Sequence, residues 1–279
     1  MREARKSSPP PAGHQARRRD TLAPRGWSGD FGIYLHYPQC RNRCGYCAFP
    51  TVNLRRFPQT AYADAVLAEL AGRAGDFAGF RLRSIYLGGG TPSLWAPRQI
   101  GRVVDAARQR FAGAGQTGNE RAAIEVTVEG NPETLTPRRL AGLREAGVDR
   151  LSIGVQSLDD RALRLLTRNH SAGQAARALR AARRCGFESV SADLIFGFEG
   201  QTVAHHLQQL EALLGLEPDH VSTYALTLSR EAPLRRAGHR PAGEDLAAEM
   251  MEQTRVLLEA AGLLQYEVSN YARQGHRSV

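Results

Sequence analysis

The stretch Gly32-Ile-Tyr-Leu-His-Tyr-Pro-Gln-Cys40-Arg-Asn-Arg-Cys44-Gly-Tyr-Cys47 joins a short strand-forming run to a loop with three cysteines. The run Gly32–His36 is of the kind that predicts a β-strand. The loop that follows has the spacing C-x3-C-x2-C, which lets three thiolates wrap round three corners of an iron–sulfur cube. The stretch therefore predicts a strand with a cluster-binding loop at its carboxyl end.

Beyond this stretch, short β-branched runs alternate with longer segments of helical period, as in repeated βα units with a parallel sheet. The predicted strands are Gly32–His36, Ser84–Leu87, Ala123–Glu129, Arg150–Val155, Ser189–Phe196 and His220–Leu226, with a seventh candidate at Gln265–Val268. Helices are expected near residues 59–73, 97–112, 136–146, 159–167, 171–184, 202–214 and 243–261.

Such units either open into a doubly wound sheet or curl into a barrel. The strands show no dinucleotide-binding fingerprint, so we predict an α/β fold of the barrel kind. Several polar or glycine residues stand at the ends of predicted strands: Gly88–Pro92, Glu129, Gln156 and Asp193. Because the carboxyl ends of barrel strands form the active-site rim, these residues and the cysteine loop are expected to converge on one cavity.

Cys40, Cys44 and Cys47 are predicted to hold a [4Fe–4S] cluster whose fourth iron stays open. An open iron can chelate the amino and carboxylate groups of S-adenosylmethionine (SAM), and one electron from the cluster can then cleave the sulfonium. Two alternatives stay open, namely a structural zinc site to which His36 could supply a fourth ligand, and plain reduced cysteines. Cys185, at the end of a predicted helix, is interpreted as a packing residue.

The glycine-rich run and the third predicted strand supply further candidate ligands. Three successive glycines let backbone groups approach a ligand closely. The period of two along the strand puts Glu125, Thr127 and Glu129 on one face. A carboxylate inside a barrel needs a partner. The ammonium group or the ribose hydroxyls of SAM would serve Glu129, and a nearby arginine is the alternative.

Six ordered motifs together resemble the coproporphyrinogen-oxidase-like branch of the radical SAM proteins. They are Tyr34–Phe49, Gly88–Ser93, Glu129–Pro132, Arg150–Ser157, Asp193–Gly197 and Tyr266–Tyr271. The resemblance runs from Phe31 to the C-terminus. It implies a partial (β/α)6-type radical SAM barrel over residues 27–279, behind a basic arm at residues 1–26 that is expected to be disordered.

The resemblance also implies which residues contact SAM, with His36 as a candidate for a catalytic role. The implied SAM contacts are Tyr34, Tyr46, Gly89, Gly90, Thr91, Glu129, Gln156, Arg168, Asp193 and Ala225. Tyr46 can lie beside the adenine, and Arg168 suits the carboxylate of SAM. Gln156 and Asp193 can hydrogen-bond to the ribose or to the adenine edge. Each could instead be a satisfied polar group of a barrel interior.

Two functions compete within this branch. The oxygen-independent coproporphyrinogen III oxidase, which acts on a porphyrinogen, carries a further cysteine two positions after the third cluster ligand. This chain has Phe49 there. The Cys-x-Phe end of its cysteine motif is similar to that of the heme chaperones of the HemW family. The resemblance then implies a protein that binds heme and passes it to an acceptor protein, with an electron donor for the cluster. Whether the chain is an enzyme stays open.

The heme-chaperone family continues beyond a segment like Ser269–His276 into a small C-terminal domain, whereas this chain ends at Val279. We therefore expect that domain to be absent and the chain to be a fragment or a shortened product. A porphyrin exposes a large apolar face that needs a walled cavity. The 279-residue chain is accordingly expected neither to hold heme tightly nor to turn over coproporphyrinogen III.

Composition and charge limit the remaining classes of function, partner and location. The formal net charge is +9, but +5 of it lies in Met1–Gly26, so no nucleic-acid partner is expected. No run approaches the roughly 20 apolar residues of a membrane span. Reduced cysteines fit a cytoplasmic protein. An organelle leader is the alternative for the Arg-rich arm, although its prolines and the acids Glu3 and Asp20 argue against it.

Overall fold

The computed structural model describes residues 29–111 and 124–279. The predicted basic arm at residues 1–26 lies outside the described residues, as do residue 112 of the second predicted helix and Ala123 of the third predicted strand.

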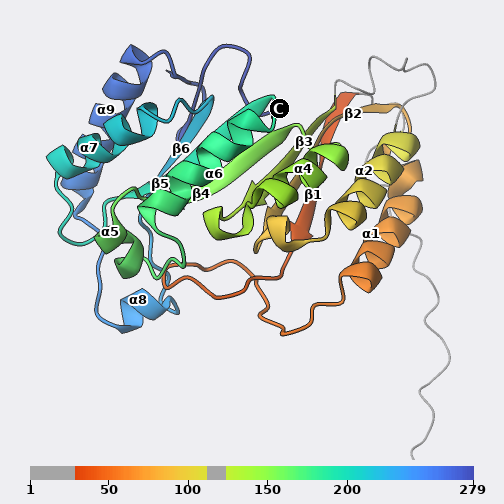
Figure 1. The fold of residues 1–279 in the computed structure, drawn as a ribbon, viewed down its shortest axis with the longest axis horizontal. Helices are drawn as coiled ribbons and strands as arrows, with labels where there is room; N and C mark the ends of the chain where they lie inside the picture. The colour runs from red at the N-terminus through yellow and green to blue at the C-terminus, as the bar shows by residue number, and fades with distance from the viewer. Residues whose placement is uncertain (1–28, 112–123) are drawn as a thin grey trace, which may run out of the picture.

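Within the described residues, the centre of the fold is one sheet of eight strands in the order β1-β2-β3-β4-β5-β6-β8-β7, seen in Figure 1. The strands are β1 Gly29–Tyr37, β2 Phe80–Gly89, β3 Glu125–Gly130, β4 Arg150–Gln156, β5 Ser189–Phe196, β6 His220–Ala225, β7 Leu264–Gln265 and β8 Asn270–Ala272. Strands β1 to β6 are parallel, each paired with the next in sequence. Because β1 and β7 end the order, the sheet is open, and the predicted partial barrel of parallel strands is confirmed.

The seventh candidate strand, Gln265–Val268, is wrong. The chain instead forms β7 and β8, which pair antiparallel with each other and, through β8, with β6. A tight turn separates them because the Glu267 carboxylate accepts hydrogen bonds from Ser269 N at 3.2 Å and from Asn270 Nδ2 at 2.6 Å. Such local side-chain to backbone bonds favour a turn over a continued strand.

The helices cover the outer face of the sheet and its lower edge in Figure 1. They are α1 Gln59–Arg73, α2 Pro97–Phe111, α4 Pro137–Glu145, α5 Asp160–Leu165, α6 Ala172–Arg184, α7 Val203–Leu214, α8 Pro233–Arg236 and α9 Glu244–Ala260. The hydroxyls of Thr136, Ser171 and Thr202 accept a backbone N–H from the first turn of the helix that follows. These N-caps explain why several predicted helices begin one residue early. Short α8, absent from the predicted elements, begins with a proline at its first position.

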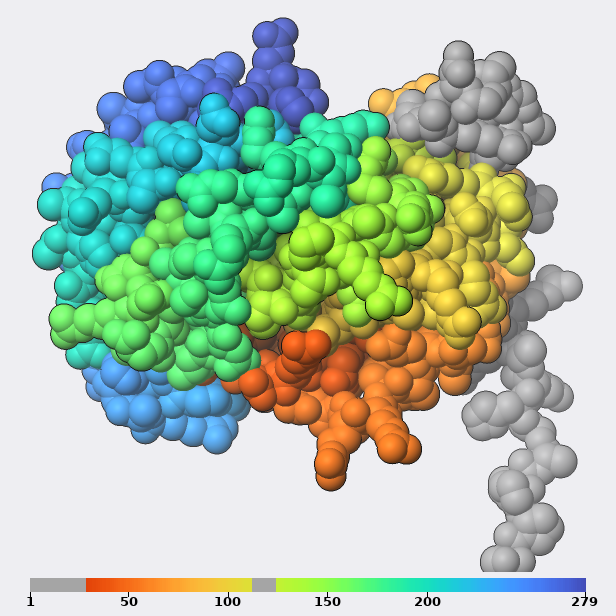
Figure 2. All heavy atoms as spheres, in the orientation of Figure 1, coloured from red at the N-terminus to blue at the C-terminus, as the bar shows by residue number. Residues whose placement is uncertain are grey.

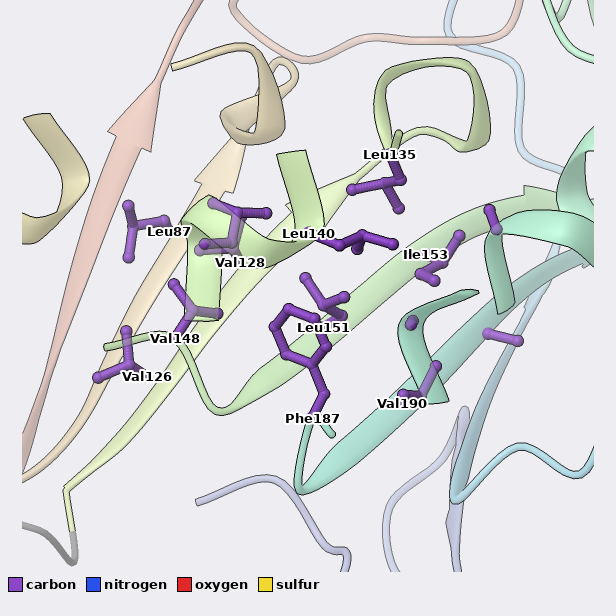
Figure 3. Close-up of a cluster of buried hydrophobic side chains, with 14 of the residues drawn as sticks. Leu87, Val126, Val128, Leu135, Leu140, Val148, Leu151, Ile153, Phe187 and Val190 are labelled. Atoms are coloured by element: carbon purple, nitrogen blue, oxygen red, sulfur yellow. The ribbon is translucent and has the colours of Figure 1, made fainter. Parts of the chain in front are cut away.

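The main core lies between the sheet and these helices, as Figure 3 shows around β3, β4 and α4. Val126 and Val128 of β3 are fully buried there, together with Leu140 of α4. Because side chains alternate along a strand, Glu125, Thr127 and Glu129 are left facing the barrel interior. The two faces of β3 therefore separate as the sequence predicts. In the described part of the chain, no helix is long and apolar enough to cross a membrane.

Candidate cluster and cofactor site

The cysteine loop follows β1 at its carboxyl end. Backbone hydrogen bonds fix its course, from Cys40 N to Val52 O at 2.9 Å and from Cys47 N to Cys44 O at 3.1 Å. All three thiols are free and partly buried. The loop thus brings three thiols to the rim formed by the carboxyl ends of the strands, where Figure 1 shows the segment between β1 and α1 along the lower edge.

Two hydrogen-bond donors from distant parts of the chain reach these thiols. Thr91 Oγ1 lies 3.5 Å from Cys40 Sγ, and Arg168 Nη1 lies 3.4 Å from Cys44 Sγ. Thiolate ligands of iron–sulfur clusters are stabilised by donors of this kind, which also set the reduction potential. The residues present therefore fit an anionic cluster held on three thiolates.

Asn131, which follows β3, connects the two donors. Its Oδ1 accepts from Arg168 Nη2 at 2.6 Å, and its Nδ2 donates to Thr91 Oγ1 at 3.2 Å. Arg168 is held further by the Gly154 carbonyl oxygen at 2.9 Å. One continuous chain of hydrogen bonds thus runs from Cys40 through Thr91, Asn131 and Arg168 to Cys44. The sequence prediction missed Asn131, although it stands in the quoted motif after Glu129.

His36 lies beside the loop with both ring nitrogens engaged. Its Nδ1 is 3.2 Å from the Tyr34 hydroxyl, and its Nε2 is 2.9 Å from the Pro50 carbonyl oxygen. Among the described residues, no three His, Cys, Asp or Glu side chains lie close enough together to hold one metal ion. An iron–sulfur cube asks for a different arrangement, because each thiolate binds its own iron.

The glycine-rich run at the end of β2 is packed tightly against β1 and the residues after it. Gly89 has a φ of +111°, and a Cβ there would lie 2.6 Å from the His36 ring. A Cβ on Gly90 would lie 2.7 Å from the Pro38 carbonyl oxygen. The close approach predicted for these glycines thus serves packing within the chain, since side chains would clash at both positions.

A cavity of about 550 Å³ opens inside the barrel next to the cysteine loop. Its volume is in the range typical of small-molecule sites. The predicted residues that line it are Tyr46, Cys47, Glu129, Gln156, Asp193 and Ala225. Gly90 and Thr91 line a recess of about 60 Å³ that shares Glu129 and Asp193 with the large cavity, and Arg168 lies beside Thr91 and Cys44.

Tyr34 and Gly89 lie just outside the large cavity but beside its carboxylate. Tyr34 stacks on Tyr86 with ring centroids 6.1 Å apart, and Gly89 donates its N–H to Glu129 Oε2 at 3.0 Å. The structure therefore gathers all ten predicted SAM contacts, together with the three cysteines, around one end of the barrel.

Glu129 is held inside the barrel by two neutral donors. Besides the Gly89 N–H, the Tyr86 hydroxyl donates to its Oε1 at 2.9 Å. These partners replace the arginine that the sequence left as an alternative. Burial, together with the nearby Asp193 carboxylate, raises the pKa of Glu129 to about 7.

Asp193 forms the second buried carboxylate of the cavity. The Ser152 hydroxyl lies 2.9 Å and 3.1 Å from its two oxygens, and burial raises the Asp193 pKa to about 6. Two carboxylates in one poorly solvated cavity favour a cationic ligand, because a positive charge relieves both. Ser152 was missed by the sequence prediction, although its alternation with the buried Leu151 and Ile153 was a signal that it faces inward.

Gln156 ends β4 with a φ of +63°, a backbone conformation that is uncommon for a residue other than glycine. Its side chain lines the large cavity. Strained backbone of this kind clusters at ligand sites, so it is consistent with the role predicted for Gln156.

Comparison with known proteins agrees with this geometry. Residues 34–213 match the profile of the Radical SAM superfamily. The chain is 41% identical over 251 residues to the Bos taurus protein named radical S-adenosyl methionine domain-containing protein 1, mitochondrial, covering 88% of this chain and 55% of the relative. It is 34% identical to the heme chaperone HemW of Escherichia coli, covering 88% of this chain and 63% of that protein.

Among solved structures, the coproporphyrinogen III oxidase HemN of Escherichia coli, described as a radical SAM enzyme, superposes with a TM-score of 0.75 at 27% identity. The match covers 88% of this chain and 56% of the oxidase. The chain thus spans less than two thirds of the length of each of these proteins.

Proposed function

Because this chain belongs to the radical SAM superfamily, we propose that it is a heme-binding protein of the HemW type, built round a [4Fe–4S] cluster on Cys40, Cys44 and Cys47. The family implies the cluster and SAM. When bound, the cluster supplies one electron at an iron whose open position chelates SAM. The residues around the cysteine loop would bind and orient the SAM molecule at that iron.

Each group of residues has a distinct part. Glu129 and Asp193 offer negative charge to the cationic SAM molecule. Tyr46, partly buried and next to Cys47 in sequence, lines the large cavity and offers it an aromatic ring. Arg168, held in place by Asn131, offers a guanidinium next to Cys44 for a carboxylate. SAM would therefore lie across the rim with its amino-acid end toward the cysteine loop.

The observation that favours the heme chaperone over the oxidase is Phe49. The oxidase resemblance requires a cysteine at this position, and this chain presents an apolar ring there, 59% exposed at the mouth of the large cavity. An exposed aromatic side chain suits contact with the flat apolar face of a porphyrin. The relatives named HemW support the same choice. The oxidase stays the alternative because its solved structure superposes on 88% of this chain.

The test is a pair of assays on anaerobically reconstituted protein. Heme is titrated while the Soret band is followed, and coproporphyrinogen III is supplied with SAM and a reductant while protoporphyrinogen formation is measured. Because the chain as it stands is not expected to hold heme tightly, the proposal expects weak but saturable heme binding that Phe49→Ser weakens further, and no protoporphyrinogen. Turnover of coproporphyrinogen III would establish the oxidase alternative instead. Formation of 5′-deoxyadenosine in the second assay would show that SAM is cleaved and that the chain is an enzyme.

The proposal also covers the partner protein and the location of the chain in the cell. A heme chaperone needs an acceptor protein, so heme loaded on this chain should pass to an apoprotein that binds heme more tightly. We also propose a cytoplasmic location, while the name of the Bos taurus relative supports the organelle-leader alternative for the basic arm. Fractionation of cells that produce the tagged chain distinguishes the two.

A further inference from the structure

The segment between β1 and α1, residues 38–58, surrounds the cysteine loop with positive charge. It contains Arg41, Arg43, Arg55 and Arg56 but no lysine, aspartate or glutamate. All four arginines are exposed. The segment returns on itself so that its two halves are neighbours, because Gln39 Nε2 donates to the Leu54 carbonyl oxygen and Asn53 Nδ2 to the Arg41 carbonyl oxygen. The arginines therefore share one face of the protein.

Helix α8 adds to this face. The Leu234 backbone N–H donates to the Gly45 carbonyl oxygen at 2.9 Å, between Cys44 and Cys47, and a Cβ on Gly45 would meet the Leu234 side chain at 2.8 Å. The next two residues, Arg235 and Arg236, are exposed. Figure 2 shows the 38–58 segment in orange and α8 in light blue along the lower edge of the molecule.

We call the resulting face the arginine surface and define it by Arg41, Arg43, Arg55, Arg56, Arg235 and Arg236. Arg41 and Arg43 belong to the cysteine loop itself, and Arg43 Nη2 donates to the Cys47 carbonyl oxygen at 3.2 Å. None of the six forms an ion pair with an acidic side chain of the described residues. Exposed apolar side chains, Val52 and Leu54, lie among them. Clustered like charges without partners create a local field that attracts the opposite charge.

From this arrangement we propose that the arginine surface is the docking site for an acidic one-electron carrier protein that reduces the cluster. This inference rests on the proposed cluster. The carrier loses one electron and the [4Fe–4S]2+ cluster gains it to become [4Fe–4S]1+, with no bond made or broken. The position favours such a partner, because Arg41 and Arg43 stand in the cysteine loop and α8 hydrogen-bonds to it at Gly45. A redox centre docked on this face would therefore come close to the iron. Arginines among a few apolar side chains suit a small, transient, charge-steered interface.

The test is the rate at which photochemically prepared flavodoxin hydroquinone, an acidic carrier, reduces the reconstituted cluster in stopped-flow. The variant Arg55→Gln/Arg56→Gln/Arg235→Gln removes three charges and spares Arg41 and Arg43 next to the thiols. We expect its second-order rate constant to fall about tenfold at low ionic strength, and its dependence on salt to weaken.

A matched control carries the same charge change on another face. Arg177→Gln/Arg180→Gln/Arg184→Gln removes three exposed arginines of α6, which likewise form no ion pair in the described part of the chain. Its rate constant should equal that of the unaltered protein. Any of three results would overturn the proposal. The two triple variants could have equal rate constants, the rate constant of the unaltered protein could be independent of salt, or neither flavodoxin nor an acidic ferredoxin could reduce the cluster.

Two further measurements separate this inference from its premise. Chemical reduction by dithionite and the iron content should be the same in all three proteins. If the unaltered chain contained no iron and showed no reduction by dithionite, the proposed cluster would be refuted rather than the docking site. Sedimentation with phosphatidylserine vesicles tests another occupant. Vesicle binding that the Arg55→Gln/Arg56→Gln/Arg235→Gln variant loses, without any change in the rate of reduction, would assign the arginine surface to an anionic membrane and overturn the proposal.

Discussion

Asn131 Oδ1 accepts a 2.6 Å hydrogen bond from Arg168 Nη2, and this contact joins the end of β3 to the segment after α5. The guanidinium that it orients lies against Cys44. A residue outside every predicted ligand set thereby positions a donor to a predicted cluster ligand.

Removal of this amide should destabilise the protein. Asn131→Ala deprives a largely buried guanidinium of an acceptor, so the free energy of unfolding of the cluster-free protein should fall by about 1.5–3 kcal/mol. Urea denaturation measures it. Asn131→Asp keeps an acceptor for Arg168 and should cost less. Equal losses in the two variants would show that the contact to Arg168 contributes little.

The raised pKa of Glu129 predicts a dependence of stability on pH. The folded-state pKa of about 7 lies above the ordinary value of 4.5. A carboxyl of this kind stabilises the fold only while protonated, so its contribution is full below about pH 4.5 and is lost as the pH rises through about 7. The free energy of unfolding of the cluster-free protein should therefore fall less steeply over this interval in Glu129→Gln. Identical slopes would assign the pH dependence to other groups, Asp193 among them.

Binding of SAM should show the opposite trend. A cationic ligand prefers the ionised carboxylate, so the affinity of the reconstituted protein for SAM should rise as the pH passes about 7. Glu129→Gln should keep the cluster but weaken binding by about 1.5–3 kcal/mol, measured by equilibrium dialysis. Glu125→Gln is the matched control, because Glu125 faces the same interior but bonds to Thr127 outside the large cavity. The same loss in both variants would argue against a direct contact with Glu129.

The three loop cysteines should be individually required for the cluster. Anaerobic reconstitution is expected to yield about four irons and four sulfides per chain. Cys40→Ala, Cys44→Ala or Cys47→Ala should each abolish the brown chromophore. Cys185, which caps the end of α6 and packs against the core, supplies the control. Loss of the chromophore in Cys185→Ala would mean that the ligand set is wrong.

Gln156 allows strain and binding to be separated. Gln156→Gly relieves the strain of a left-handed backbone conformation, which costs a residue other than glycine about 1–2 kcal/mol. This gain offsets the conformational entropy cost of about 0.5–1 kcal/mol that glycine brings. Thermal unfolding should accordingly show no loss of stability, while SAM affinity falls. Gln156→Val keeps the strain and should unfold at a lower temperature. If Gln156→Gly bound SAM as tightly as the unaltered protein, Gln156 would be a structural residue only.

The sequence by itself determined those features that depend on neighbours along the chain. The period of two in β3 sent Val126 and Val128 to the core and Glu129 to the interior, and the C-x3-C-x2-C spacing placed three thiols in one loop. Both follow from backbone geometry, which repeats over a few residues. The parallel order of the strands followed in the same way from their alternation with helices.

Only the tertiary structure decided which distant groups meet. Arg168 reaches the thiol of Cys44 across 124 positions of sequence, and Glu129 bonds to Tyr86 and Gly89 rather than to an arginine. Strand β8, which follows the local turn at Glu267, is placed by its antiparallel pairing with β6. Such partners are set by strand register and by the curvature of the sheet, and these follow from packing of the whole core rather than from any local pattern.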